Sequence, residues 1–136
     1  LPLLCPITYV DEVPMLDGGV CDSIPVERSM TQGYQRNVVV LTRNRGYRKE
    51  GKDMKLPSFI YRKYPAMRQA LANRNSVYNT QLDLVERLED EGKIFVIRPE
   101  EPITVDRIEK DTNKLLALYE EGYECGKNIV NLKFIE

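Results

Sequence analysis

The sequence predicts an α/β fold with a mainly parallel sheet. Two short apolar runs, NVVVLTR (37–43) and KIFVIRP (93–99), have the composition of strands that are buried on both faces. Helical patterns lie between them, and Gly92 alone separates the second helix from the second strand. This order is the βαβ unit of a parallel sheet, with a right-handed crossover. At 136 residues, we expect residues 1–136 to form a single α/β unit.

The segment before the first strand is expected to be irregular. Its first ten residues are apolar and interrupted by prolines, which favours a buried loop or a short strand. Asp11, Glu12 and Pro14 then predict a polar turn before Met15. The polar stretch Glu27–Arg36 favours a short helix that stops near Gly33.

Two helices are expected between the strands. The first starts at Pro57 and Ser58, is interrupted or kinked at Pro65, and continues to Asn73. Ser76 is expected to cap the second, which Gly92 ends. The apolar positions of the second helix form one stripe. They are Val77, Leu84, Val85 and Leu88.

A last long helix is expected from Thr104, its cap, to Gly126. Asp106 and Glu109 are acids near its positive end, where they stabilise a helix. The tail Asn128–Glu136 could add an edge strand. The apolar stripe of this helix comprises Val105, Ile108, Leu115, Leu116, Tyr119 and Tyr123.

The absence of histidine is the most restrictive feature of the composition. It removes the Ser-His-Asp triad, the Cys-His pair and most zinc sites. Any general base has to be a carboxylate, a lysine or a tyrosine, and we expect neither a metal nor a cofactor. The three cysteines are odd in number and form no CxxC, which indicates a reducing compartment. No apolar run approaches the roughly 18 residues that span a bilayer, so we expect a cytoplasmic protein.

The stretch LDGGVCDSIPV places Asp17 directly before Gly18 and Gly19. An Asp-Gly pair is most simply a turn, because aspartate caps its own backbone and glycine accepts a positive φ. The two glycines also remove side chains beside the carboxylate, and Val20 and Ile24 could desolvate it, which suits a general base. The residues alone leave both interpretations open.

The longer run YVDEVPMLDGGVCDSIPV resembles the second catalytic motif of patatin-like phospholipases. In that motif, D-G-G or D-G-A is followed by an acid or asparagine, an aliphatic residue and proline. The later runs VVVLTRNRGYRK, IFVIRPEEP and LYEEGYECGK look like the C-terminal half of bacterial members. The likeness covers nearly the whole chain. It implies the C-terminal portion of a three-layer α/β/α sandwich with a mainly parallel sheet.

The resemblance implies a serine acyl hydrolase that cleaves a lipid or ester substrate with a Ser-Asp dyad. Asp17 would be the base, Gly18 and Gly19 would shape the site, and backbone N–H groups would stabilise the oxyanion. The family's G-x-S-x-G is absent, because no serine here is flanked by glycines. These serines are Ser23, Ser29, Ser58 and Ser76. Since the chain starts at Leu1 within an apolar segment, we expect the nucleophile to precede it and the chain alone to be inactive.

Three further features are candidate sites. Asp22 is expected to fix the loop rather than to react, and Cys21 to pack in the core. The segment 43–63 carries eight basic residues against two acids, a local charge of +6. It is a solvated face or, in a lipid hydrolase, a docking surface for anionic headgroups, so the protein could be peripheral to a membrane. Nucleic acid is the least favoured partner, because no recognition motif is present and the net charge is −1.

A second hypothesis comes from a different class of function. A non-catalytic α/β binding module could use the backbone N–H groups of the DGG turn to hold an anion such as phosphate. The two hypotheses differ in whether Asp17 takes part in a reaction.

Overall fold

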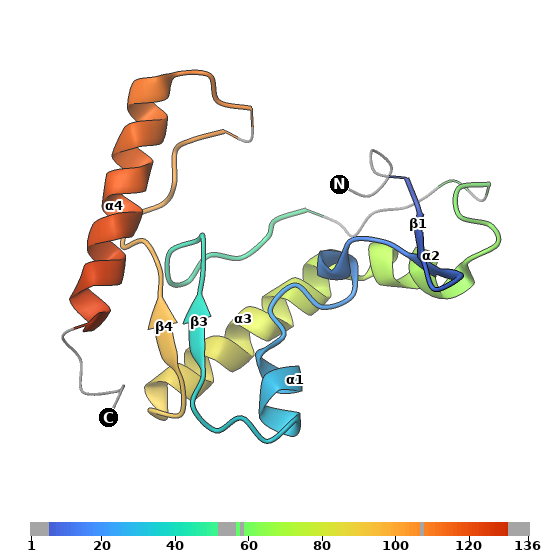
Figure 1. Cartoon of the computed structure of the whole chain (residues 1–136), viewed down its shortest axis with the longest axis horizontal. Helices are drawn as coiled ribbons and strands as arrows, with labels where there is room; N and C mark the ends of the chain where they lie inside the picture. Colours follow the sequence, from blue (N-terminus) through green and yellow to red (C-terminus); the bar gives the residue numbers. More distant parts are fainter. Residues whose placement is uncertain (1–5, 52–56, 58, 107, 131–136) are drawn as a thin grey trace. The chain divides into compact units, whose positions relative to one another are not determined.

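The computed structural model describes residues 6–51, 57, 59–106 and 108–130 (Figure 1). Within them the chain is mixed α/β and contains two small sheets of two strands each. Its internal contacts divide it into two compact units. The first unit comprises Leu1–Ser29 and Arg48–Leu84, and the second comprises Met30–Tyr47 and Val85–Glu136.

The first unit starts with an antiparallel hairpin of β1 (Thr8–Val10) and β2 (Val13–Met15). Asp11 and Glu12 form its two-residue loop, with φ angles of 48° and 64°. Positive φ at both central residues is what a type I′ hairpin turn requires. The predicted polar turn is therefore confirmed at Asp11 and Glu12, whereas Pro14, which was expected to belong to it, lies in β2.

Strand β1 confirms the short strand that was one of the two alternatives for this N-terminal segment, but the expected burial is wrong for the residues that the structure describes. Both strands of the hairpin are exposed along their whole length. A lone two-stranded ribbon of three-residue strands has too few side chains on either face to bury itself. Residues 1–5 lie outside the described part of the chain.

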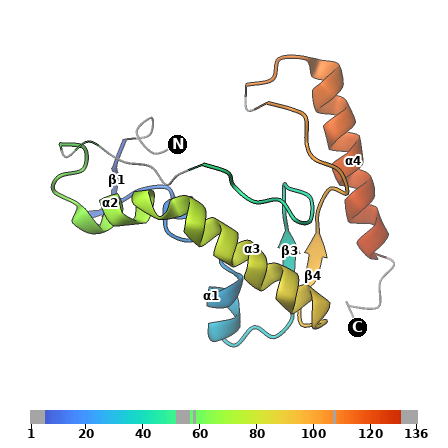
Figure 2. The ribbon, with the colours of Figure 1, turned by 180° about the vertical axis from the view of Figure 1, so that it is seen from behind.

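Helix α2 (Pro65–Ala72) begins at Pro65 instead of being kinked by it. Proline is well accommodated in a first helical turn, where its missing N–H would have no partner. Residues 59–63 form turns and residue 57 is not helical, so the predicted helical start before Pro65 is wrong there. Residue 58 lies outside the described part of the chain. Figure 2 shows α2 leading almost directly into α3 (Arg74–Asp90).

Ser76 does not cap α3, because the helix already starts at Arg74. The Ser76 hydroxyl donates instead to the carbonyl of Asn73, at 3.4 Å. Leu71 of α2, which is 1 % exposed, lies at the centre of the first unit's core. The other buried apolar residues of this unit are Val20, Ile24, Val26 and Leu82. Leu82 was not in the predicted stripe, and Val77, which was, is exposed.

Helix α1 (Val26–Thr31) confirms the predicted short helix, and Gly33, with φ of 95°, follows it as the expected stop. In the second unit, β3 (Val38–Val40) and β4 (Phe95–Ile97) pair in parallel. The predicted parallel pairing of the two apolar runs is therefore confirmed. They lie side by side in Figure 1.

The expectation that β3 is buried on both faces is wrong. Val39 is 9 % exposed, but Val38 and Val40 on the opposite face are 52 % and 68 % exposed. Full burial of both faces requires a larger sheet with a layer on each side, and among the described residues this sheet consists of β3 and β4 alone. Strand β4 is half-buried. The second unit's buried apolar residues are Val39, Leu41, Val85, Leu88 and Ile94.

Gly92 ends α3 as predicted, since the helix stops at Asp90 and Gly92 has a φ of 66°. Its N–H donates to the carbonyl of Glu89 at 2.9 Å. The last helix, α4 (Thr112–Val130), contacts β4. It starts well after the predicted cap Thr104.

The later start of α4 has a local cause. Asp111 Oδ1 accepts from the N–H of Asn113 at 2.9 Å, which caps the helix at Asp111. The predicted end at Gly126 is also wrong, because the helix continues through it to Val130. Residues 128–130 of the predicted edge strand therefore belong to α4, and residues 131–136 lie outside the described part.

The predicted apolar stripe of the last helix is largely exposed. Ile108 precedes α4 and is 84 % exposed. Four members of the stripe on α4 itself are exposed as well: Leu115, Leu116, Tyr119 and Tyr123.

None of the helices in the described residues has both the length and the apolar character that crossing a bilayer requires.

Candidate functional site

Asp17 lies at the start of a single turn of 3₁₀ helix, η1 (Gly18–Val20), in the first unit. Its carboxylate Oδ1 accepts from the N–H of Gly19 at 2.9 Å, and its carbonyl accepts from the N–H of Val20 at 3.0 Å. The predicted capping turn is therefore confirmed. The side chain of Asp17 is exposed even though Val20 and Ile24 are buried, so these two apolar residues leave it open to solvent.

The two glycines of the motif have different roles, and neither has the positive φ that the sequence suggested. A Cβ added to Gly18 would meet no atom within 4 Å. A Cβ added to Gly19 would lie 3.3 Å from Oδ1 of Asp17 and 3.8 Å from Oγ of Ser23. Gly19 is thus the residue that lets the carboxylate fold back onto the turn, and Gly18 leaves open space beside it.

The backbone N–H groups of the turn are used within the turn. Four consecutive residues, 19 to 22, each donate to an oxygen of Asp17 or Gly18. The distances are 2.9 Å (Gly19 N to Asp17 Oδ1), 3.0 Å (Val20 N to Asp17 O), 3.1 Å (Cys21 N to Gly18 O) and 3.0 Å (Asp22 N to Gly18 O). An anion placed against this turn would have to compete with these bonds.

Helix α3 anchors the turn from a distant part of the sequence. Arg74 Nε donates to the carbonyl of Gly19 at 3.1 Å. Gln81 donates from Nε2 to Asp22 and accepts at Oε1 from the N–H of Ile24 at 3.2 Å. The structural role expected for Asp22 is confirmed. Sequence reasoning missed Arg74 and Gln81, because they are more than 50 positions away from their partners and belong to no motif.

Cys21 was expected to pack in the core, but it does not. It is exposed at the end of η1, and Val20 beside it is 2 % exposed. A one-turn helix directs neighbouring side chains in different directions, so only one of the two can point inward.

Among the residues that the structure describes, no cluster of three histidine, cysteine or acidic side chains could hold a metal ion.

The basic segment 43–63 is partly neutralised by acids of α3. In the second unit, Arg45 forms an ion pair with Asp90 at 2.7 Å, and this carboxylate raises the pKa of Arg45. In the first unit, Arg48 forms an ion pair with Asp83 at 2.6 Å. The ammonium of Lys49 lies 3.7 Å from the centre of a tyrosine ring of α3. Membrane contact through this segment stays a prediction, with less free charge behind it than the sequence suggested.

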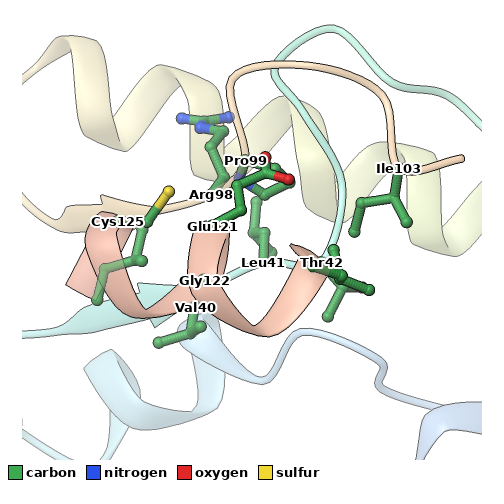
Figure 3. A pocket seen from close by; sticks show the side chains of 11 residues that line it. Val40, Leu41, Thr42, Arg98, Pro99, Ile103, Glu121, Gly122 and Cys125 are labelled. Atoms are coloured by element: carbon green, nitrogen blue, oxygen red, sulfur yellow. The ribbon is translucent and has the colours of Figure 1, made fainter. Parts of the chain in front are cut away.

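The second unit contains a cavity of about 250 Å³ where α4 lies near the ends of β3 and β4 (Figure 3). Most of its lining is apolar, and none of the predicted site residues belongs to it. It is lined by Val40, Leu41, Thr42, Ile97, Arg98, Pro99, Ile103, Leu118, Glu121, Gly122 and Cys125. The Arg98 side chain is 9 % exposed and pairs with Glu89 of α3, and its burial lowers the pKa of its guanidinium.

Comparison with known proteins gives one match. No curated protein and no solved structure matches the chain. A family model described as a domain of unknown function, DUF6363, matches residues 64–132, which include α2, α3, β4 and α4 but not the DGG turn. Because the match covers just over half of the 136 residues, the chain belongs to the DUF6363 family.

Proposed function

We propose that the chain supplies the acid of a Ser-Asp dyad in a serine acyl hydrolase that acts on lipid esters. In this proposal the chain is the C-terminal part of a three-layer α/β/α sandwich, as its resemblance to patatin-like phospholipases implies. The observation that carries the proposal is the geometry of Asp17. Its carboxylate is exposed, and Oδ1 accepts a hydrogen bond from the N–H of Gly19. Gly18 leaves open space beside this carboxylate.

In a Ser-Asp dyad the base is a carboxylate and not an imidazole. The carboxylate of Asp17 would take the proton from the serine hydroxyl while the serine oxygen attacks the ester carbonyl. It would then return that proton to the leaving alcohol as the carbonyl re-forms and the ester bond breaks. The bond from Gly19 to Oδ1 orients the carboxylate before the reaction starts. The serine and the oxyanion donors would come from residues outside this chain.

The anion-binding alternative has less support. It depends on free backbone N–H groups in the DGG turn, and the four N–H groups of residues 19 to 22 already donate to oxygens of Asp17 and Gly18. A phosphate would also meet the negative charge of Asp17 at this turn. Both features weigh against an anion site of this type.

The test uses the full-length protein, a fluorophosphonate probe and a short p-nitrophenyl ester. We expect the probe to label one serine and Asp17→Asn to lower kcat by about 10³-fold, since an amide cannot accept the proton. Asparagine is as good a cap as aspartate, so the turn should keep its stability. Asp11→Asn, at the exposed hairpin loop, is the matched control and should leave kcat unchanged. Normal turnover in Asp17→Asn, or no labelled serine, would contradict the proposal.

A further inference from the structure

The DGG turn is flexible by composition, so something must hold it. Glycine loses more conformational freedom on folding than any other residue, and this turn has two in succession. The Asp17 carboxylate is hydrogen-bonded to the N–H of Gly19, so a displacement of Gly19 also displaces the carboxylate. A misplacement of about 1 Å in a catalytic group can cost about 100-fold in rate.

Two side chains of α3 hold this turn at separate points. Arg74 fixes the carbonyl of Gly19, across 55 positions of sequence. Gln81 fixes the N–H of Ile24, across 57 positions, and the carboxylate of Asp22, across 59. Arg74 and Gln81 are seven residues apart, close to two helical turns, so they leave α3 on the same face. These contacts lie at the two ends of the stretch from Gly19 to Ile24.

We propose that Arg74 and Gln81 are positioning residues for Asp17, an inference that rests on the proposed function of that carboxylate. They act on the turn through Gly19, Asp22 and Ile24. Ser23 adds a local bond, because its hydroxyl donates to the same Gly19 carbonyl at 2.8 Å. Gly19 is therefore held at its N–H by Asp17 and at its carbonyl by two donors.

The chemistry of Gln81 suits this role. An amide side chain donates and accepts at the same time without adding a charge near the base. A glutamate at this position could still accept from Ile24, but it would place a second carboxylate against Asp22. An apolar side chain of similar length would lose both bonds. These two kinds of substitution give different expected results.

The first experiment measures backbone hydrogen exchange in the full-length protein. Gln81→Met removes both bonds, and we expect exchange at Ile24 and at residues 19–22 to become about tenfold faster, which corresponds to about 1.4 kcal/mol of local opening. Gln69→Met, at an exposed position of α2, is the matched control and should leave these amides unchanged. Unchanged exchange in Gln81→Met would overturn the inference.

The second experiment introduces a negative charge at position 81 and then restores activity with a second substitution. We expect Gln81→Glu to lower kcat for the p-nitrophenyl ester about tenfold with little change in KM, because the base is displaced but the substrate still binds. Adding Asp22→Asn provides a new donor and should restore kcat to within about twofold. A purely structural defect would not be rescued in this way.

The two experiments separate the inference from the proposed function. If the wild-type protein hydrolyses no ester but Gln81→Met still accelerates exchange, the anchoring by α3 stands and the proposed function fails. If the wild-type protein is active but Gln81→Met and Arg74→Met change neither exchange nor kcat, the inference is overturned and the proposed function stands.

Discussion

The DGG turn of the first unit and the β3–β4–α4 region of the second unit are built in different ways. The turn is held by hydrogen bonds to Arg74 and Gln81. Oδ1 of Asp17 accepts from the N–H of Gly19. In the described residues of the β3–β4–α4 region, two strands pair, and Val40 and most of the α4 stripe are exposed. Hydrogen bonds fix the positions of individual atoms, whereas apolar contacts are non-directional.

The difference shows where chemistry and where packing should be sought in this chain. A carboxylate on a hydrogen-bonded turn has the fixed geometry that proton transfer requires. An exposed apolar helix face has no such geometry, and its effect on stability is small while it stays exposed. Four tests probe this contrast, in order of decreasing expected effect.

The largest effect is expected in the core of the first unit. Leu71→Ala in α2 should lower the free energy of unfolding by about 3 kcal/mol, because Leu71 is 1 % exposed and its removal leaves a cavity. Leu116→Ala in α4 is the matched control, since Leu116 is 55 % exposed, and it should cost less than about 0.5 kcal/mol. Urea unfolding followed by circular dichroism measures both. Equal losses would show that the α4 face is covered in solution.

The next effect concerns the two glycines of the turn. Gly19→Ala should cost about 1 kcal/mol, because the new Cβ lies 3.3 Å from Oδ1 of Asp17 and pushes the carboxylate away from its donor. Gly18→Ala has no atom within 4 Å of its new Cβ and should stay within about 0.5 kcal/mol of the wild type. The same urea titration measures both variants. If Gly18→Ala proved the more damaging, the geometry of the turn would be wrong.

A third glycine should respond in the opposite direction. Gly122 lies within α4 and beside the cavity, and a Cβ there would meet no atom within 4 Å. Gly122→Ala should therefore stabilise the protein by about 0.5 to 1 kcal/mol through the helix backbone alone. Thermal unfolding checks this as a higher Tm. A lower Tm would indicate that the space beside Gly122 is filled in solution.

The smallest effect is a pH dependence near the start of α4. Glu109 accepts from the backbone N–H groups of Asp111 and Lys110, at 3.0 and 2.9 Å, and these bonds, with a smaller effect of Lys114, lower its pKa. A lowered pKa in the folded state means that the stabilisation is complete above the unfolded value of about 4.3 and is lost as the pH falls further. Glu109→Gln should therefore differ from the wild type at pH 7 and match it near pH 3 in urea titrations. A difference that grows at low pH would contradict this sign.

The features that the sequence predicted correctly depend on neighbouring residues. The Asp17 cap, the turn at Asp11 and Glu12 and the stops at Gly33 and Gly92 need only a few adjacent positions. The parallel pairing of β3 with β4 was also predicted, because a strand, helix and strand in succession allow few alternatives.

The features that it missed depend on competition or distance. Asp111, and not Thr104, caps α4. Ser76 lies inside α3, because Asn73 alone separates that helix from α2. The anchoring by Arg74 and Gln81 requires knowledge of the tertiary fold. So does the exposure of the β3 valines, since a valine run cannot show which layers cover it.

The hairpin before the DGG turn has a consequence for insertions and deletions. Surface loops usually tolerate changes in length. The loop of Asp11 and Glu12 is different, because one added residue would shift the pairing of β1 with β2 and turn alternate side chains to the opposite face. Strand β2 ends at Met15, two residues before Asp17, so such a shift would also change how the chain enters the turn. Relatives of this chain should therefore exchange residue types at this loop, with glycine or asparagine favoured at position 12, and keep its length constant.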